Sequence, residues 1–361
     1  MIDGIIPFEI ADEPRAIRET LAQSAEGARA AADGLRARGV ARIYVIGNGT
    51  SYHSSLAAAT LYRRHALLGD PTVIALTAGE FRTYLPALGP TDAVIGISAS
   101  GEFRDVVAVV EALRGRVPTV AVVHVPGSTL DGTADHVVRS AGGPSNVPVM
   151  TKTFASTLVA TELVLAEVLG GDRAKRIRHA IAQAADHVAT AIAAAEPRIE
   201  GLVDALANAE HLFVVGSGGA YPAALEAALK LKEMAIVHAE GTESWEMASG
   251  AATIIDAGAV VIALAPTGPG STATIDVARH AASWGARVIE VAPIQSIDGA
   301  ELLPLPTDAE EDFAPLNAVA PVALLAFALA RRRGYDPDRP AWVERYHSQG
   351  LRHIVGVGKE S

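Results

Sequence analysis

Two short segments in the first half of the sequence combine glycine with hydroxyl side chains. They are Gly47-Asn48-Gly49-Thr50-Ser51 and Ser98-Ala99-Ser100-Gly101-Glu102, and each lies between a short apolar run and a helical stretch. Backbone N–H groups at the start of a helix, together with Ser and Thr hydroxyls, form an anion site, and phosphate is the obvious anion. One such loop alone is more often an ordinary turn and helix cap. Two of them after successive strands favour a phosphate site.

The second half carries acidic side chains whose spacing suits proton transfer. Glu226, Lys230 and Glu233 are spaced i, i+4 and i+7, which places them on one face of a helix. The commoner meaning of such spacing is a solvated Glu–Lys ladder. Further acids follow within residues 240–246, packed among apolar residues. Close to a predicted anion pocket, these carboxylates are candidates for general acid–base catalysis.

Composition and missing motifs exclude several classes of protein. There is no Cys, which excludes disulfides, cysteine nucleophiles and thiolate metal sites. The 11 His are scattered, so we expect neither a metal nor another cofactor, and the Gly-x-Gly segments lack the third glycine of a dinucleotide site. A net charge of −11 argues against a nucleic-acid partner. The longest apolar run, residues 318–330, is too short to span a membrane and predicts a buried core helix; with no signal-peptide pattern, we expect a cytoplasmic protein.

The elements that must position these residues occur twice. Residues 42–49 and 211–218 are each a β-branched run that ends in Gly-x-Gly and precedes an Ala- and Leu-rich helical stretch. Further apolar runs lie at 93–97 and 119–123 in the first half, and at 259–265 and 287–291 in the second. Short apolar strands that alternate with helices indicate parallel sheets covered on both faces. The sequence therefore predicts an α/β fold of two tandem, doubly wound domains.

Helices and turns set the expected domain limits. A long helix is predicted from Glu13-Pro14 to about Arg38, because Pro suits a first helical turn. A second, from residue 172 to about 207, should join the halves. We expect an N-terminal helix and first domain in residues 1–196, and a second domain with a C-terminal tail in residues 197–361.

Many of these segments resemble the sugar isomerase (SIS) family, and in particular the isomerase half of the glucosamine-6-phosphate synthases. The resemblance covers nearly the whole chain, through residues 9–21, 49–52, 79–82, 98–102, 125–128, 151–152, 221–233 and 238–240. The segment at 221–233 matches almost letter for letter. The resemblance implies two flavodoxin-like SIS domains, a phosphorylated sugar or amino sugar as ligand, and a homodimer with sites at the subunit interface.

The resemblance also implies roles for single residues. Glu233 stands where the family has the general base that moves a proton between C1 and C2 through an enediol. Substrate or phosphate contacts are implied for the following positions: Gly49, Thr50, Ser51, Ser98, Ala99, Ser100, Glu102, Phe103, Val149 and Met150.

The sequence departs from the family at two catalytic positions. Ser249 stands where the family has its ring-opening His, and Glu246, His238 or His347 are candidates to replace it. Arg345 stands where the family has a tail Lys; Arg keeps the charge but cannot form a Schiff base.

The sequence also departs from the family within the phosphate loops. Ala99 replaces a Gln, Phe103 a Thr and Met150 a Ser. The second loop therefore lacks some donors, while its Ser-x-Ser-Gly turn remains.

Three hypotheses of function follow. The synthases begin with a glutaminase domain whose nucleophile is an N-terminal Cys, and this sequence shows neither, so we expect chemistry with ammonia and not glutamine. The first hypothesis is a deaminase or isomerase of the glucosamine-6-phosphate type with Glu233 as base. The second is a deglycase that releases an amino acid from a fructosamine phosphate. The third is a sugar-phosphate-binding protein without catalysis, which would act through a protein partner.

Overall fold

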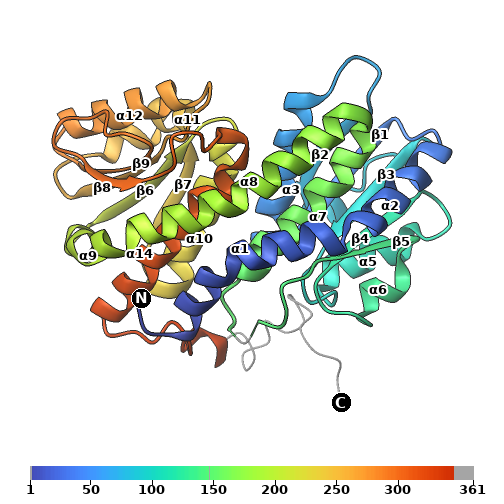
Figure 1. The fold of residues 1–361 in the computed structure, drawn as a ribbon, viewed down its shortest axis with the longest axis horizontal. Coiled ribbons are helices and arrows are strands. Elements are labelled where there is room, and N and C mark those ends of the chain that lie inside the picture. Colours follow the sequence, from blue (N-terminus) through green and yellow to red (C-terminus); the bar gives the residue numbers. More distant parts are fainter. Residues whose placement is uncertain (1, 146, 345–361) are drawn as a thin grey trace. The chain divides into compact units, whose positions relative to one another are not determined.

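Short apolar strands pair in parallel in both halves of the chain. The computed structural model describes residues 2–145 and 147–344, in which two separate five-stranded sheets are present (Figure 1). The first has the order β2-β1-β3-β4-β5. Its strands are β1 (Arg42–Gly47), β2 (Thr72–Thr77), β3 (Asp92–Ile97), β4 (Thr119–Val123) and β5 (His136–Arg139).

The second sheet repeats this topology. Its order is β10-β9-β8-β6-β7, so the first strand of each half lies between the second and the third. Its strands are β6 (His211–Gly216), β7 (Ala239–Glu243), β8 (Ala259–Leu264), β9 (Arg287–Ala292) and β10 (Glu301–Pro304). This is the doubly wound, flavodoxin-like order, and it confirms the predicted fold class.

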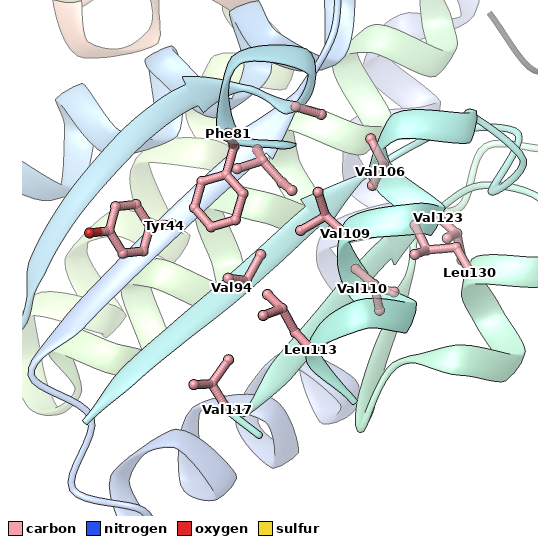
Figure 2. Close-up of a cluster of buried hydrophobic side chains, with 13 residues drawn as sticks. Tyr44, Phe81, Val94, Val106, Val109, Val110, Leu113, Val117, Val123 and Leu130 are labelled. Carbon is pink, nitrogen blue, oxygen red and sulfur yellow. The ribbon is translucent and has the colours of Figure 1, made fainter. Parts of the chain in front are cut away.

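Helices cover both faces of the first sheet. One face contacts α2 (Ala25–Ala37), α3 (Thr50–His65) and α7 (Lys152–Leu169); the other contacts α4 (Ala78–Thr83), α5 (Arg104–Leu113) and α6 (Thr129–Thr133). Figure 2 shows the hydrophobic cluster on this second face, where Phe81 meets Tyr44 edge-on with ring centroids 5.2 Å apart. The central strands β1, β3 and β4 are buried on both sides, as their continuous apolar sequences predict.

Helices cover the second sheet in the same way. One face packs against α9 (Ile199–Ala207), α10 (Ala220–Ala235) and α14 (Val319–Arg332), and the other against α11 (Ser244–Ser249) and α12 (Ser271–Ser283) (Figure 1). Shorter segments are η2 (Ala251–Ile254), η3 (Glu311–Phe313) and α13 (Ala314–Asn317). Within the described residues, one helical stretch, Glu311–Arg332, is long and apolar enough to cross a membrane, but 94% of its most apolar window is buried. It packs as the core helix that the sequence predicts.

The long helix predicted over residues 13–38 is wrong in its bounds. The structure has α1 (Ile5–Gln23), with Pro14 in its interior, and α2 after a break at Ser24. The Asp338 carboxylate accepts hydrogen bonds from the N–H groups of Ile5 and Ile6, both at 2.9 Å, and so caps α1 about two turns earlier than the proline suggests. The Ser24 hydroxyl donates to the Arg139 carbonyl at 2.7 Å and so ties the junction of the two helices to the end of β5.

The helix predicted from residue 172 to about 207 is also interrupted. It comprises α8 (Gly171–Ala195), the 3₁₀ turn η1 (Glu196–Arg198) and α9. Pro197 lies in the short turn, where its missing N–H costs no helical hydrogen bond.

Contacts between residues divide the described chain into two compact units. Unit 1 draws on Met1–Pro14, Ser145–Thr151 and Gln183–Pro340; unit 2 draws on Arg15–Pro144, Lys152–Ala182 and the segment that begins at Ala341. The expected domain boundary between residues 196 and 197 stays a prediction, because it was drawn from the sequence repeat and not from contacts.

Candidate functional site

The first candidate loop follows β1 at the switch point of the first sheet. Since β1 lies between β2 and β3, the carboxyl ends of β1 and β3 adjoin, which is where doubly wound sheets bind ligands. Gly49 has a φ of 54° directly before α3, and a Cβ on Gly47 would lie 2.6 Å from the backbone of Ser51. The glycines therefore let the first turn of α3 approach the end of the strand, with Thr50 and Ser51 buried.

Ser98 organises the second loop, which follows β3. Its hydroxyl accepts hydrogen bonds from the N–H groups of Gly101 at 3.1 Å and Phe103 at 3.4 Å, and the residue is 3% exposed. The Ser100 hydroxyl lies 3.5 Å from that of Ser98 and accepts from the N–H of Glu102 at 3.2 Å. Because both oxygens act as acceptors inside the loop, a hydroxyl hydrogen remains to be donated to an anion.

The other residues of this loop have structural partners. The Ala99 carbonyl accepts from the N–H of His124 at 2.9 Å. The Glu102 carboxylate accepts from the N–H of Thr129 at 2.8 Å and from its hydroxyl at 2.7 Å, at the start of α6. Phe103 directly precedes α5 and packs against the hydrophobic cluster of Figure 2. These residues fix the loop, and their contact with substrate stays a prediction.

A buried ion cluster lies on α10 in unit 1. Lys230 has a side chain only 1% exposed, and its ammonium nitrogen lies 3.1 Å from the carboxylate of Glu226 and 2.6 Å from that of Glu233. It also donates to the Met150 carbonyl at 3.0 Å. Three N–H donors thus meet three acceptors. This spacing usually indicates a solvated Glu–Lys ladder, but that interpretation is wrong here, because Lys230 and Glu226 are buried.

Burial and charge act in opposite directions on the groups of this cluster. Burial lowers the pKa of Lys230, but the attraction of Glu226 and Glu233 outweighs it, so that the pKa lies above its ordinary value. Glu13, from α1, interacts electrostatically with Lys230 and Glu226 of this cluster. Burial raises the pKa of Glu13 from 4.5 to about 8, against the opposing attraction of Lys230. At neutral pH Glu13 is therefore mostly a neutral acid, while Lys230 stays charged.

Glu233 is the member of the cluster that reaches solvent. Its side chain is 25% exposed, whereas that of Glu226 is fully buried. Three residues later, Ile236 adopts a φ of 54°, which is strained for a β-branched residue and ends α10. Glu233 thus presents an oriented carboxylate at the last turn of the helix, as a general base requires.

Ser249, which replaces the family's His, and the candidate Glu246 lie on α11. The Ser249 hydroxyl donates to the Trp245 carbonyl in its own helix at 2.7 Å, and both Ser249 and Glu246 are exposed. His238 is exposed in the connection between α10 and β7. None of these placements assigns a role.

The predicted residues form two groups, one in each unit. In unit 2 the hydroxyl residues of the two loops lie at the adjoining ends of β1 and β3. In unit 1 Glu233 and the Met150 carbonyl meet at Lys230, and Val149 is buried. Arg345 and His347 lie outside the described residues.

Lys230 and Glu13 were missing from the predicted site. The i, i+4, i+7 spacing was a usable signal for Lys230, but nothing in the sequence links Glu13 to α10. Across residues 2–145 and 147–344, the structure shows no group of three or more metal-ligating side chains.

Residues 38–166 and 205–326 match the family model of the SIS domain. The chain belongs to the SIS-domain family. Over 94% of its length it is 34% identical to the glutamine–fructose-6-phosphate aminotransferase (isomerizing) of Methanothermobacter thermautotrophicus, of which it covers 56%. A relative of the same name from Gloeobacter violaceus is 33% identical over 92% of this chain and 56% of its own length. The chain thus spans about half the length of the curated relatives it matches.

Solved structures agree with the two-sheet fold. The C-terminal domain of glucosamine-fructose-6-phosphate aminotransferase from Francisella tularensis matches with a TM-score of 0.83 at 23% identity, covering 94% of this chain and 99% of that one. The glucosamine-6-phosphate deaminase from Thermotoga maritima matches with a TM-score of 0.69 at 19% identity, covering 90% and 97%. At these identities the likeness shows the fold alone. The expected membership of the sugar isomerase family rests on the family model and the curated relatives.

Proposed function

We propose that the chain is an enzyme that acts on an amino-sugar phosphate and exchanges its aldose and ketose forms, with Glu233 as the general base. The observation that carries the proposal is the Lys230–Glu233 ion pair of 2.6 Å, which holds a solvent-reaching carboxylate beside a buried ammonium. A carboxylate held in this way can remove a proton from C2 of the aldose and return it to C1 through an enediol. The names of the aminotransferase and deaminase relatives support this class of substrate.

The hydroxyl loops of unit 2 are proposed to bind the phosphate of the sugar. Ser98 and Ser100 provide hydroxyl donors after β3, and Thr50 and Ser51 begin α3, which has 16 residues and directs its positive end at the same edge of the sheet. In the deaminating direction, glucosamine 6-phosphate and water would give fructose 6-phosphate and ammonia, which needs no redox partner.

The proposal is tested with Glu233→Gln, which preserves the shape of the side chain and removes its basicity. We expect ammonia release from glucosamine 6-phosphate to fall by about 10²–10⁴-fold, the usual contribution of general base catalysis. The melting shift given by the sugar phosphate should persist. Glu240→Gln, at an exposed position on β7, is the matched control and should keep full activity. Full activity in Glu233→Gln would refute the base assignment.

Assays on the same purified protein distinguish the proposed function from two others, a deglycase and a sugar-phosphate-binding protein. Amino-acid release from a fructosamine 6-phosphate, without ammonia release from glucosamine 6-phosphate, would indicate a deglycase. A melting shift with the sugar phosphate but no turnover of either compound would indicate a binding protein.

We also propose that the chain works in the cytoplasm as a homodimer. The resemblance to the synthases supports this, as do the exposed Trp245 and Ile254 beside α11, which are apolar side chains available for a protein contact. Sedimentation at several protein concentrations tests the dimer, and a monomer at all of them would exclude it.

A further inference from the structure

The second sheet has a switch point that corresponds to the phosphate edge of the first. β6 lies between β7 and β8, so the carboxyl ends of β6 and β8 adjoin. The loop after β6 leads through Gly219 into α10, and the loop after β8 leads through Gly270 into α12. Two helices of 16 and 13 residues therefore begin at this edge, where their N–H groups favour a negative charge.

The chain's own Glu311 fills this position. One carboxylate oxygen accepts from the N–H of Gly219 at 3.3 Å, and the other accepts from the N–H of Gly270 at 2.6 Å. Glu311 is 4% exposed. A single buried carboxylate thus bridges the starts of both helices, as a bound phosphate would.

The surrounding glycines leave room for this side chain and for little else. A Cβ on Gly218 would lie 1.9 Å from a carboxylate oxygen of Glu311, and one on Gly268 would lie 2.4 Å from its Cβ. A Cβ on Gly270 would come within 2.8 Å of the second oxygen. Replacement of any of these glycines would therefore collide with Glu311 or push it out.

Further hydrogen bonds hold Glu311 in place and engage the hydroxyl group of Ser217. The N–H of Glu311 donates to the Thr267 carbonyl at 2.8 Å, which ties η3 to the loop after β8. The Ser217 hydroxyl, in the loop after β6, donates to Glu243 at 2.5 Å. A second internal carboxylate therefore takes the one hydroxyl that the β6 loop offers.

We infer that Glu311 is a built-in anion that closes the switch point of the second sheet, so that no phosphate group binds at this edge of the sheet. Because Glu311 belongs to the same chain, its carboxylate is present at this position at a high effective concentration. A free phosphate would have to displace this buried carboxylate in order to bind. The two halves share a topology but differ in use: hydroxyl donors remain available in the first, and carboxylates are already bound in the second.

The test compares melting temperatures of the full chain with and without inorganic phosphate, at an ionic strength matched with chloride. Glu311→Ala should melt well below the wild type, and inorganic phosphate should raise its melting temperature more than that of the wild type, because it enters the vacated position. Glu310→Ala, at the exposed neighbouring position, is the matched control and should respond as the wild type does. Any general stabilisation by phosphate is common to all three proteins.

Glu311→Gln keeps the test decisive if the alanine variant does not fold. The amide preserves the shape and loses the charge, so this variant should fold and still melt below the wild type. Wild-type melting of Glu311→Gln, or a phosphate response of Glu311→Ala equal to that of Glu310→Ala, would overturn the inference. The absence of any phosphate response in the wild type would count against the proposed phosphate loops of unit 2 and would leave the comparison at Glu311 intact.

Discussion

The ammonium group of Lys230 lies 2.6 Å from the carboxylate of Glu233. The same group lies 3.1 Å from the carboxylate of Glu226, which is fully buried. The Met150 carbonyl takes the third donor of the same ammonium group. Lys230 therefore compensates a buried charge on one side and orients the proposed base on the other. If Glu233 is the base, as proposed, then stability and turnover depend on the same nitrogen atom.

Replacement of Lys230 by Met should strongly destabilise unit 1. The substitution leaves the Glu226 carboxylate buried without its cation, and breaking a buried pair in this way costs about 3–5 kcal/mol. Urea unfolding followed by circular dichroism measures the loss. Lys232→Met, at an exposed position of the same helix, is the control and should change the unfolding free energy by less than about 0.5 kcal/mol. Equal stability of the two variants would contradict the role of Lys230, and adding Glu226→Gln to Lys230→Met should recover part of the loss.

Stability should fall between pH 4.5 and about 8 because of Glu13. Its pKa is raised from 4.5 to about 8 on folding, so the folded state binds the proton more tightly. The resulting stabilisation is complete below pH 4.5 and is lost as the pH rises through about 8; it amounts to at most roughly 5 kcal/mol. Glu13→Gln should flatten this part of the stability profile and should exceed the wild type in stability above pH 8. Glu26→Gln, at an exposed position on α2, should retain the wild-type slope, and a wild-type slope in Glu13→Gln would refute the assignment.

Alanine variants of Ser98 and Ser100 should distinguish a role in the stability of the loop from a role in phosphate binding. Ser98→Ala leaves the N–H groups of Gly101 and Phe103 without their acceptor, at a cost of about 1–3 kcal/mol. Ser100→Ala, at an exposed position, should cost less than about 0.5 kcal/mol. Both variants should give a smaller melting shift with fructose 6-phosphate, because each removes a hydroxyl donor. Unchanged shifts in both would indicate that phosphate does not bind to this loop.

The Arg42–Asp92 pair should make the free energy of unfolding fall at acid pH. Asp92 is buried and receives two hydrogen bonds of 2.8 Å from Arg42, which hold the pKa of Asp92 below 3.8. A lowered pKa stabilises the fold at higher pH, and this stabilisation is lost as the pH falls through about 4 and below. Asp92→Asn should cost about 1–2 kcal/mol at pH 7, since Arg42 is partly exposed, and should remove this acid dependence.

A matched control for Asp92 exists on α8. Asp172 pairs with Lys175 at 3.0 Å, but both side chains are largely exposed. Asp172→Asn should leave the acid limb and the unfolding free energy nearly unchanged. A loss as large as that of Asp92→Asn would show that burial is not the deciding factor.

The sequence identified the three central strands of each sheet and missed the outer ones. The central strands are continuous apolar runs because helices cover both of their faces. The four missed strands, β2, β5, β7 and β10, are the edge strands of their sheets. β7 reads AEGTE and β10 ends at Pro304, which are compositions that an edge tolerates and that a sequence pattern does not distinguish from a loop.

The site was predictable where its residues are local in the chain, and not where they are distant. The Ser-x-Ser-Gly turn and the Gly-x-Gly loops follow directly from strand ends. The burial of Lys230 could not be predicted, because the same spacing serves an exposed helix face equally well. Contacts that reach from Asp338 to Ile5, or from Met150 to Lys230, depend on the tertiary fold alone.

Unit 1 is assembled from three separate stretches of chain, and this has a consequence for its biosynthesis. The Met150 carbonyl and Glu13 are translated long before Lys230, which they accompany in the finished cluster. On the ribosome, therefore, Glu13 and residues 147–151 must remain without these neighbours until α10 has emerged. A fragment that ends before residue 230 would lack the cation near which these groups lie.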